Sequence, residues 1–137
     1  MGNIKYSFLH QHNFVLHEDL YFEGQYKDFF IRVIPDQEWI QKKRGPGKFI
    51  EYIVIESYYK FLSDTYGVED EYNLSGEYNI GKVHFENHCA GFIPKDWDNP
   101  NFEENFDGLI GLFKRENLAP ISKEEFAVYR NQLAVNH

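Results

Sequence analysis

The order of the hydrophobic patterns along the chain is the feature that most constrains its fold. Apolar and aromatic residues alternate with polar ones over residues 4–16, which predicts a half-buried strand. Residues 20–23 and 29–34 predict two more strands, with Gly24 in the turn between them. The first part of the chain therefore predicts a sheet of short antiparallel strands.

A longer apolar segment, residues 49–66, predicts the main helix. Its large side chains recur at spacings of three and four residues, and Gly67 is typical of a helix end. The recurring residues are Tyr52, Ile55, Tyr59, Leu62 and Tyr66. Residues 49–55 are apolar on every side, so the start of a buried strand is the alternative interpretation.

The remainder of the chain predicts a hairpin and two helices. Residues 72–80 look like a hairpin around Ser75 and Gly76. Apolar residues of segment 102–113 fall on one helical face, and Ser122 with Glu125 forms a capping box before a last helix. The 137 residues therefore predict one α+β domain, residues 1–137, with a mostly antiparallel sheet, one long helix packed on it and two C-terminal helices.

The charge is concentrated in one segment. The net charge is −8, and residues 64–107 carry eleven acidic residues against two basic ones, for a segment charge of −9. Such a field attracts basic partners and disfavours nucleic acid, so we expect no nucleic-acid partner. The basic loop of Lys42, Lys43, Arg44 and Lys48 is the opposite signal. It is interpreted as a solvated turn, or as a contact to nucleic acid or to an acidic patch on a partner.

Two histidines one residue apart suggest a metal site. In a strand, His10 and His12 would point the same way, as metal ligands often do. They also share the alternation of Phe8 and Phe14, so we expect neutral rings bordering the core and no bound metal or other cofactor. The alternative is a small metal-dependent or hydrolytic enzyme that uses His10, His12 and Glu18.

Other catalytic patterns are weak. His84, Glu86 and His88 are expected on a solvent-facing strand surface, opposite Val83 and Phe85. Cys89, the single cysteine, lies in an acidic stretch that does not favour a thiolate. The sequence contains neither a phosphate-binding glycine loop nor a GxSxG elbow. We therefore expect a binding protein and not an enzyme.

The sequence predicts a cytoplasmic protein. It has no apolar signal-peptide region near Met1 and no apolar run long enough for a membrane span, so we expect no membrane partner.

The general character of the chain resembles that of bacterial immunity proteins, which neutralise contact-delivered or secreted toxins. These are small acidic domains rich in Tyr and Trp, and many bind basic nucleases. The resemblance implies a cognate toxin, basic and of the nuclease type, bound directly through an acidic, aromatic-containing surface. A regulator or inhibitor from a mobile element would share these features. The expected partner-binding residues are Glu69, Asp70, Glu71, Tyr72, Asp96, Trp97, Asp98, Glu103 and Glu104.

Overall fold

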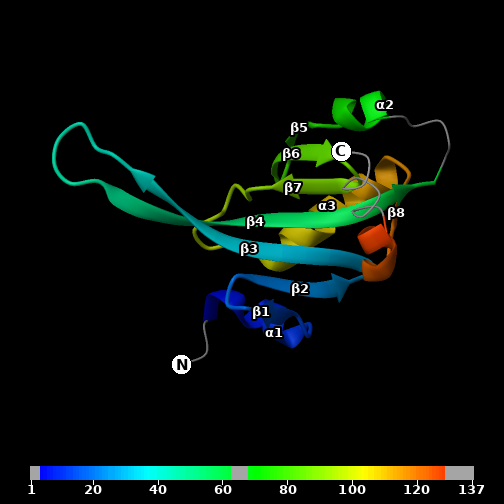
Figure 1. The fold of residues 1–137 in the computed structure, drawn as a ribbon, viewed down its shortest axis with the longest axis horizontal. Coiled ribbons are helices and arrows are strands. Elements are labelled where there is room, and N and C mark those ends of the chain that lie inside the picture. Colours follow the sequence, from blue (N-terminus) through cyan, green and yellow to red (C-terminus); the bar gives the residue numbers. More distant parts are fainter. Residues whose placement is uncertain (1–3, 63–67, 129–137) are drawn as a thin grey trace.

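An antiparallel sheet organises the computed structural model, which describes residues 4–62 and 68–128 (Figure 1). The strand order is β1-β2-β3-β4-β7-β6-β5, and β8 pairs with the end of β4. The strands are β1 (Val15–His17), β2 (Tyr21–Tyr26), β3 (Phe29–Ile40), β4 (Lys48–Phe61), β5 (Gly76–Tyr78), β6 (Gly81–Glu86), β7 (Cys89–Phe92) and β8 (Leu118–Pro120). The helices are the short 3-10 helix η1 (Ile4–Tyr6), α1 (Ser7–Gln11), α2 (Val68–Asn73) and α3 (Phe102–Arg115). Residues 123–128 are also helical.

The main core lies between one face of the sheet and α3. Alternate residues of the central strands, such as Ile31 on β3 and Ile55 on β4, are fully buried there. From α3, Phe106 and Phe113 contribute fully buried rings. The side chain of Asn101 accepts a hydrogen bond from the N–H of Glu104 and caps this helix. The helical pattern predicted for residues 102–113 is confirmed.

Two tight turns set the register of the outer hairpins. The β2–β3 turn has Lys27 and Asp28 at positive φ, and the β6–β7 turn has Asn87 and His88 at positive φ. Two successive left-handed residues are the type I′ geometry, whose twist matches that of paired strands. The turn therefore falls at residues 27–28, and Gly24 lies inside β2, where the ring of Phe14 covers it.

The second face of the sheet carries a buried charge cluster around Glu23, which is 5% exposed. Its carboxylate lies 2.7 Å from the guanidinium of Arg32, 2.8 Å from His17 and 2.9 Å from Lys123. Arg32 also approaches Glu56 at 3.6 Å. The cluster ties the C-terminal helical segment to β2 and β3.

The capping box before that segment is confirmed. Ser122 Oγ accepts from the N–H of Glu125 at 3.0 Å, and the Glu125 carboxylate accepts from the N–H of Ser122 at 3.3 Å. Phe126 stacks on Tyr58 with ring centroids 3.5 Å apart and belongs to the same small cluster as Ile121. These contacts hold the segment against the second face of the sheet.

The predicted main helix is wrong, because residues 48–61 form β4. Every second residue from Ile53 to Tyr59 is fully buried, and Tyr58 is buried on the other face of the strand. β-Branched and aromatic residues fill this segment, and packing on both faces of a central strand favours them. Leu62, expected in the buried helical stripe, is 67% exposed. Residues 63–67, which include Tyr66, lie outside the described residues.

Two further predictions of local structure are wrong. Residues 4–11 are helical, in η1 and α1, and the strand begins only at Val15. Residues 68–73 form α2, so the predicted hairpin consists of β5 and β6. Residues 4–11 fit the helical and the extended spacing equally well, and packing against the sheet decides between them. The antiparallel α+β fold itself is confirmed.

Strands β3 and β4 extend together beyond the rest of the sheet as a two-stranded ribbon (Figure 1). The pairing of β3 with β2 stops at Val33, and the pairing of β4 with β7 stops at Ile55. Residues 34–40 pair only with residues 48–54, and residues 41–47 form the tip. We call residues 34–54 the ribbon. None of the helices in the described part of the chain is long and apolar enough to cross a membrane.

Candidate functional site

One candidate site is an open cleft of about 560 Å³ between the N-terminal helices and the base of the ribbon. We call it the acidic cleft. It is lined by Lys5, Tyr6, His10, Leu16, Asp19, Phe22, Pro35, Asp36, Gln37, Glu51 and Tyr52.

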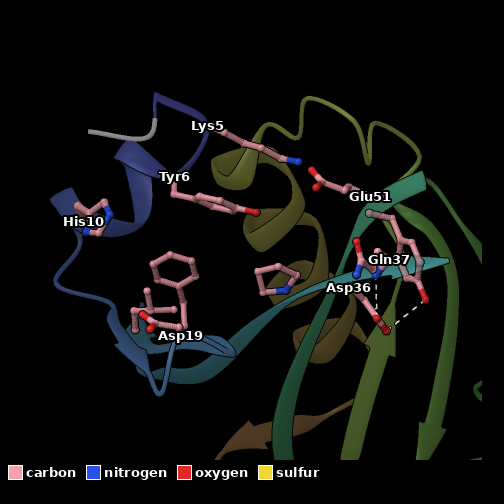
Figure 2. Close-up of a pocket in the computed structure, with 11 residues that line it drawn as sticks. Lys5, Tyr6, His10, Asp19, Asp36, Gln37 and Glu51 are labelled. Carbon is pink, nitrogen blue, oxygen red and sulfur yellow. Dashed lines mark hydrogen bonds between the residues drawn. The ribbon is translucent and has the colours of Figure 1, made fainter. Parts of the chain in front are cut away.

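Three parts of the chain supply its polar groups (Figure 2). Lys5, Tyr6 and His10 come from η1 and α1, and Asp19 comes from the turn between β1 and β2. The third part is the ribbon, where pairing places Asp36 opposite Tyr52 and Gln37 opposite Glu51. In Figure 2, Lys5 and Glu51 reach toward each other across the top of the cleft.

The cleft is acidic and its phenols are neutral. Asp36 accepts hydrogen bonds from the N–H of Gln37 at 2.8 Å and from the hydroxyl of Tyr52 at 3.2 Å. Burial and this bond raise the pKa of Tyr52, and burial together with the charge of Glu51 raises the pKa of Tyr6. Both phenols therefore keep their protons at neutral pH.

These groups suit a cationic ligand. Three carboxylates, those of Asp19, Asp36 and Glu51, face one lysine in the cleft. Carboxylates pair with an ammonium or guanidinium group, and a phenol ring attracts a cation to its face. The geometry therefore fits a lysine or arginine side chain better than an anion.

The predicted histidine pair is divided by the fold. Because residues 7–11 are helical, His10 and His12 do not share a strand face. The ring of His10 packs edge-on against Phe22, with centroids 5.7 Å apart, whereas His12 packs on Phe8 at 4.2 Å. Glu18 is exposed in the β1–β2 turn. No group of three or more His, Cys, Asp or Glu residues in the described ranges could hold a metal ion.

A second, shallower cleft of about 460 Å³ lies on the other face of the sheet and contains Cys89 and His84. Burial, followed by the charge of Glu56, raises the pKa of the Cys89 thiol far above its ordinary value. The thiol is thus protonated at neutral pH. His84 and Glu86 face outward from β6 as predicted, while His88 lies in the β6–β7 turn, with its ring nitrogen 3.0 Å from the carbonyl oxygen of Tyr59.

The expectation that Glu71 is exposed is wrong. This residue of α2 is 4% exposed, and its carboxylate accepts hydrogen bonds from the Tyr59 hydroxyl and from the N–H of His88. It joins α2 to the sheet. Tyr72 is 71% exposed, and the side chains of Glu69 and Asp70 lie outside the described residues.

The other expected partner-binding residues surround the start of α3. Asp98, Glu103 and Glu104 are exposed, and Trp97 is half-buried. Asp96 accepts hydrogen bonds from the N–H of Asn101 and the side chain of Asn105. The acids in the first turn of α3 also complement the helix dipole.

The two expected groups do not adjoin. The residues of α2, through Glu71, contact the turn where β7 begins. Residues 96–104, which we call the α3 group, follow the end of β7 (Figure 1). Whether either group contacts a partner stays a prediction.

The buried role of Glu71 leads to a stability prediction. Glu71→Ala is expected to lower the free energy of unfolding by about 2–3 kcal/mol, because the Tyr59 hydroxyl and the His88 N–H lose their common acceptor. Tyr72→Ala at the next, exposed position should change it by less than about 0.5 kcal/mol. Urea unfolding measures both. Equal effects of the two variants would contradict the buried role.

The acidic cleft was missed because the ribbon was not recognised. The sequence does contain an indication of the ribbon. If residues 49–61 form a strand, the Gly-Pro-Gly of residues 45–47 becomes the connection of a hairpin. The register then brings Asp36 beside Tyr52 and Glu51 beside Gln37. The contribution of Lys5, Tyr6 and Asp19 depends on tertiary packing, which no local pattern indicates.

Comparison of the chain with protein-family models, with curated protein sequences and with solved structures finds no significant match. The function must therefore be inferred from the site itself.

Proposed function

We propose that this chain is a binding protein that neutralises a basic partner, a cognate toxin of the nuclease type, by direct contact through an acidic, aromatic-containing surface. The acidic cleft is the centre of that surface. The observation that carries the proposal is the convergence of three carboxylates and two tyrosines on one open cleft of about 560 Å³.

The cleft has the properties that such recognition needs. Its carboxylates come from paired strands and a tight turn, so the backbone places them together before binding. Tyr6 and Tyr52 add aromatic surface, which supplies much of the affinity at protein interfaces. The net charge of −8 would speed the approach of a basic partner.

The direct test is neutralisation. Proteins encoded beside this chain's own gene would be co-expressed with it, and the expected result is that one is toxic alone and harmless in its presence. Binding of the purified pair should weaken as salt concentration rises. If none of these proteins binds the chain, the proposal is wrong.

The role of the cleft is tested by removing two of its charges. Asp19→Asn with Asp36→Asn should weaken partner binding by about tenfold or more, because both carboxylates lose their charge while the shape of the side chains is kept. Asparagine also tolerates the positive φ of position 19. Titration calorimetry with the toxin measures the affinity.

The matched control is Asp98→Asn with Glu103→Gln, which removes the same charge from the exposed surface near the start of α3. It should leave affinity within about twofold and change mainly the association rate. If the control variant loses binding and the cleft variant does not, the contact surface is the α3 group and not the cleft.

A further inference from the structure

The outer part of the ribbon leaves three large apolar side chains, Trp39, Ile40 and Phe49, exposed to water. Two-stranded hairpins are marginally stable on their own, and more strands or a packing partner normally support them. The register gives residues 34–40 no partner except residues 48–54. In Figure 1 the outer part of the ribbon, toward its tip, projects away from the helices.

An aromatic pair is built into the outer part of the ribbon. Trp39 and Phe49 are register partners with ring centroids 4.9 Å apart, yet they are 50% and 60% exposed. The indole N–H of Trp39 donates to Gln41, and a Cβ at Gly47 would lie 2.5 Å from the indole ring. The ring is thus held in place over the backbone while much of its surface remains in water.

The charges of the ribbon are ordered along its length. The tip carries Lys42, Lys43 and Arg44, with Lys48 beside them, and the stem carries Asp36, Glu38 and Glu51. The aromatic pair lies between these two groups in the register. Acidic stem, aromatic centre and basic tip therefore follow one another.

Two copies of the ribbon in antiparallel orientation have complementary charges. A second ribbon laid antiparallel, with the two aromatic pairs in contact, places each basic tip against Glu51 of the other stem, because Glu51 shares the face of Trp39 and Phe49. Asp36 and Glu38 alternate with these residues and lie on the opposite face of the ribbon. Such an arrangement is a twofold, isologous interface. It buries the aromatics at the centre, where interface energy is concentrated, and pairs the charges at both ends.

We infer that the ribbon is a self-association surface that binds the ribbon of a second copy of this chain. The stem acids favour this partner over phosphate-bearing ones, because a nucleic acid or lipid surface that follows the ribbon would meet Glu38 and Glu51. Stable interfaces bury at least about 1,000 Å² in total, so the two ribbons contact along their length and not at the tips alone. The inference needs no toxin, although the stem shares Asp36 and Glu51 with the acidic cleft of the proposed function, and sedimentation of the chain alone tests it separately.

Sedimentation of charge-reversed variants tests the inference. The wild type is expected to be a dimer at about 0.1 mM. Two variants, tip-reversed K43E/R44E and stem-reversed E51K, should each sediment as monomers, since like charges then face each other at both ends. An equimolar mixture of the two should form a heterodimer, because each reversed group meets a reversed group of opposite sign.

Two further variants complete the experiment. K82E/K95E makes the same charge change as K43E/R44E on exposed residues away from the ribbon and should remain dimeric. Trp39→Ser should weaken dimerisation by about thirtyfold or more, as for a central interface residue, with no loss of thermal stability in the monomer.

A wild type that stays monomeric at about 0.1 mM overturns the inference, as does a mixture that fails to associate. If the monomer instead binds duplex DNA or phosphatidylserine vesicles and K43E/R44E does not, the tip binds a phosphate-bearing partner and the inference is wrong.

Discussion

Replacing Phe106 with alanine is expected to lower the free energy of unfolding by about 3–5 kcal/mol. Phe106 is fully buried, and its ring centroid lies within 6 Å of those of Phe8, Phe14, Tyr26 and Phe102. It therefore joins α3 to the N-terminal helix and to β2. Because domains are stable by only about 5–15 kcal/mol, losing this ring removes a large part of the total.

Chemical denaturation measures this change, and the same helix offers the control. Gly111 is exposed, and an added Cβ would have no atom within 4 Å, so Gly111→Ala should stabilise the protein by about 0.5–1 kcal/mol. A loss of less than about 1 kcal/mol in Phe106→Ala would mean that α3 does not depend on this contact.

Replacing Arg32 with methionine is expected to cost about 3–5 kcal/mol at pH 7. Arg32 donates to Glu23 at 2.7 Å, and its guanidinium lies 4.6 Å from the centroid of the Tyr21 ring. Removing it leaves a carboxylate that is 5% exposed with fewer positive neighbours. The double variant R32M/E23M, which removes both charges, should recover most of the loss, because a buried ion pair replaced by apolar residues is often neutral in stability.

The stability difference between wild type and R32M should depend on pH through the carboxyl group of Glu23. Burial alone raises the pKa of Glu23, but hydrogen bonds from Lys123 and Arg32 outweigh it, so the pKa lies below its ordinary value. The stability from this group is fully present above an unfolded pKa of about 4.3 and is lost as pH falls through the folded pKa. The difference between wild type and R32M should therefore narrow in urea unfolding below about pH 4. A difference that grows toward acid pH would contradict the role of Glu23.

The fold class could be predicted from the sequence, but the identity of its longest strand could not. Residues 48–61 satisfy helical spacing through Tyr52, Ile55 and Tyr59, whereas in the strand every second residue from Ile53 to Tyr59 is buried on one face and Tyr58 on the other. A central strand is apolar on both faces, so its sequence lacks the alternation that identifies half-buried strands. The capping box was easier to predict than the strand. The spacing of Ser122 and Glu125 indicated two reciprocal hydrogen bonds, and the structure contains both.

The candidate site was harder to predict than the fold. Charge counting identified the segment of residues 64–107, but it could not separate exposed acids from those with a local structural role. Glu71 is enclosed by Tyr59 and His88, and Asp107 accepts hydrogen bonds from Tyr26 and Lys27. The cleft draws Asp19, Asp36 and Glu51 from a region whose acidic and basic residues balance.

The ribbon also acts as a lever. The seven residues of extended chain from Ile34 to Ile40 span about 20 Å, so a tilt of about 10° at the root moves the tip by about 3–4 Å. The direction in which the tip points is therefore set at the root, where Val33 and Ile53 are fully buried in the core. A substitution at either buried position would change the direction of the tip, although the tip residues themselves are unchanged. Buried positions alone could therefore alter the association of two ribbons.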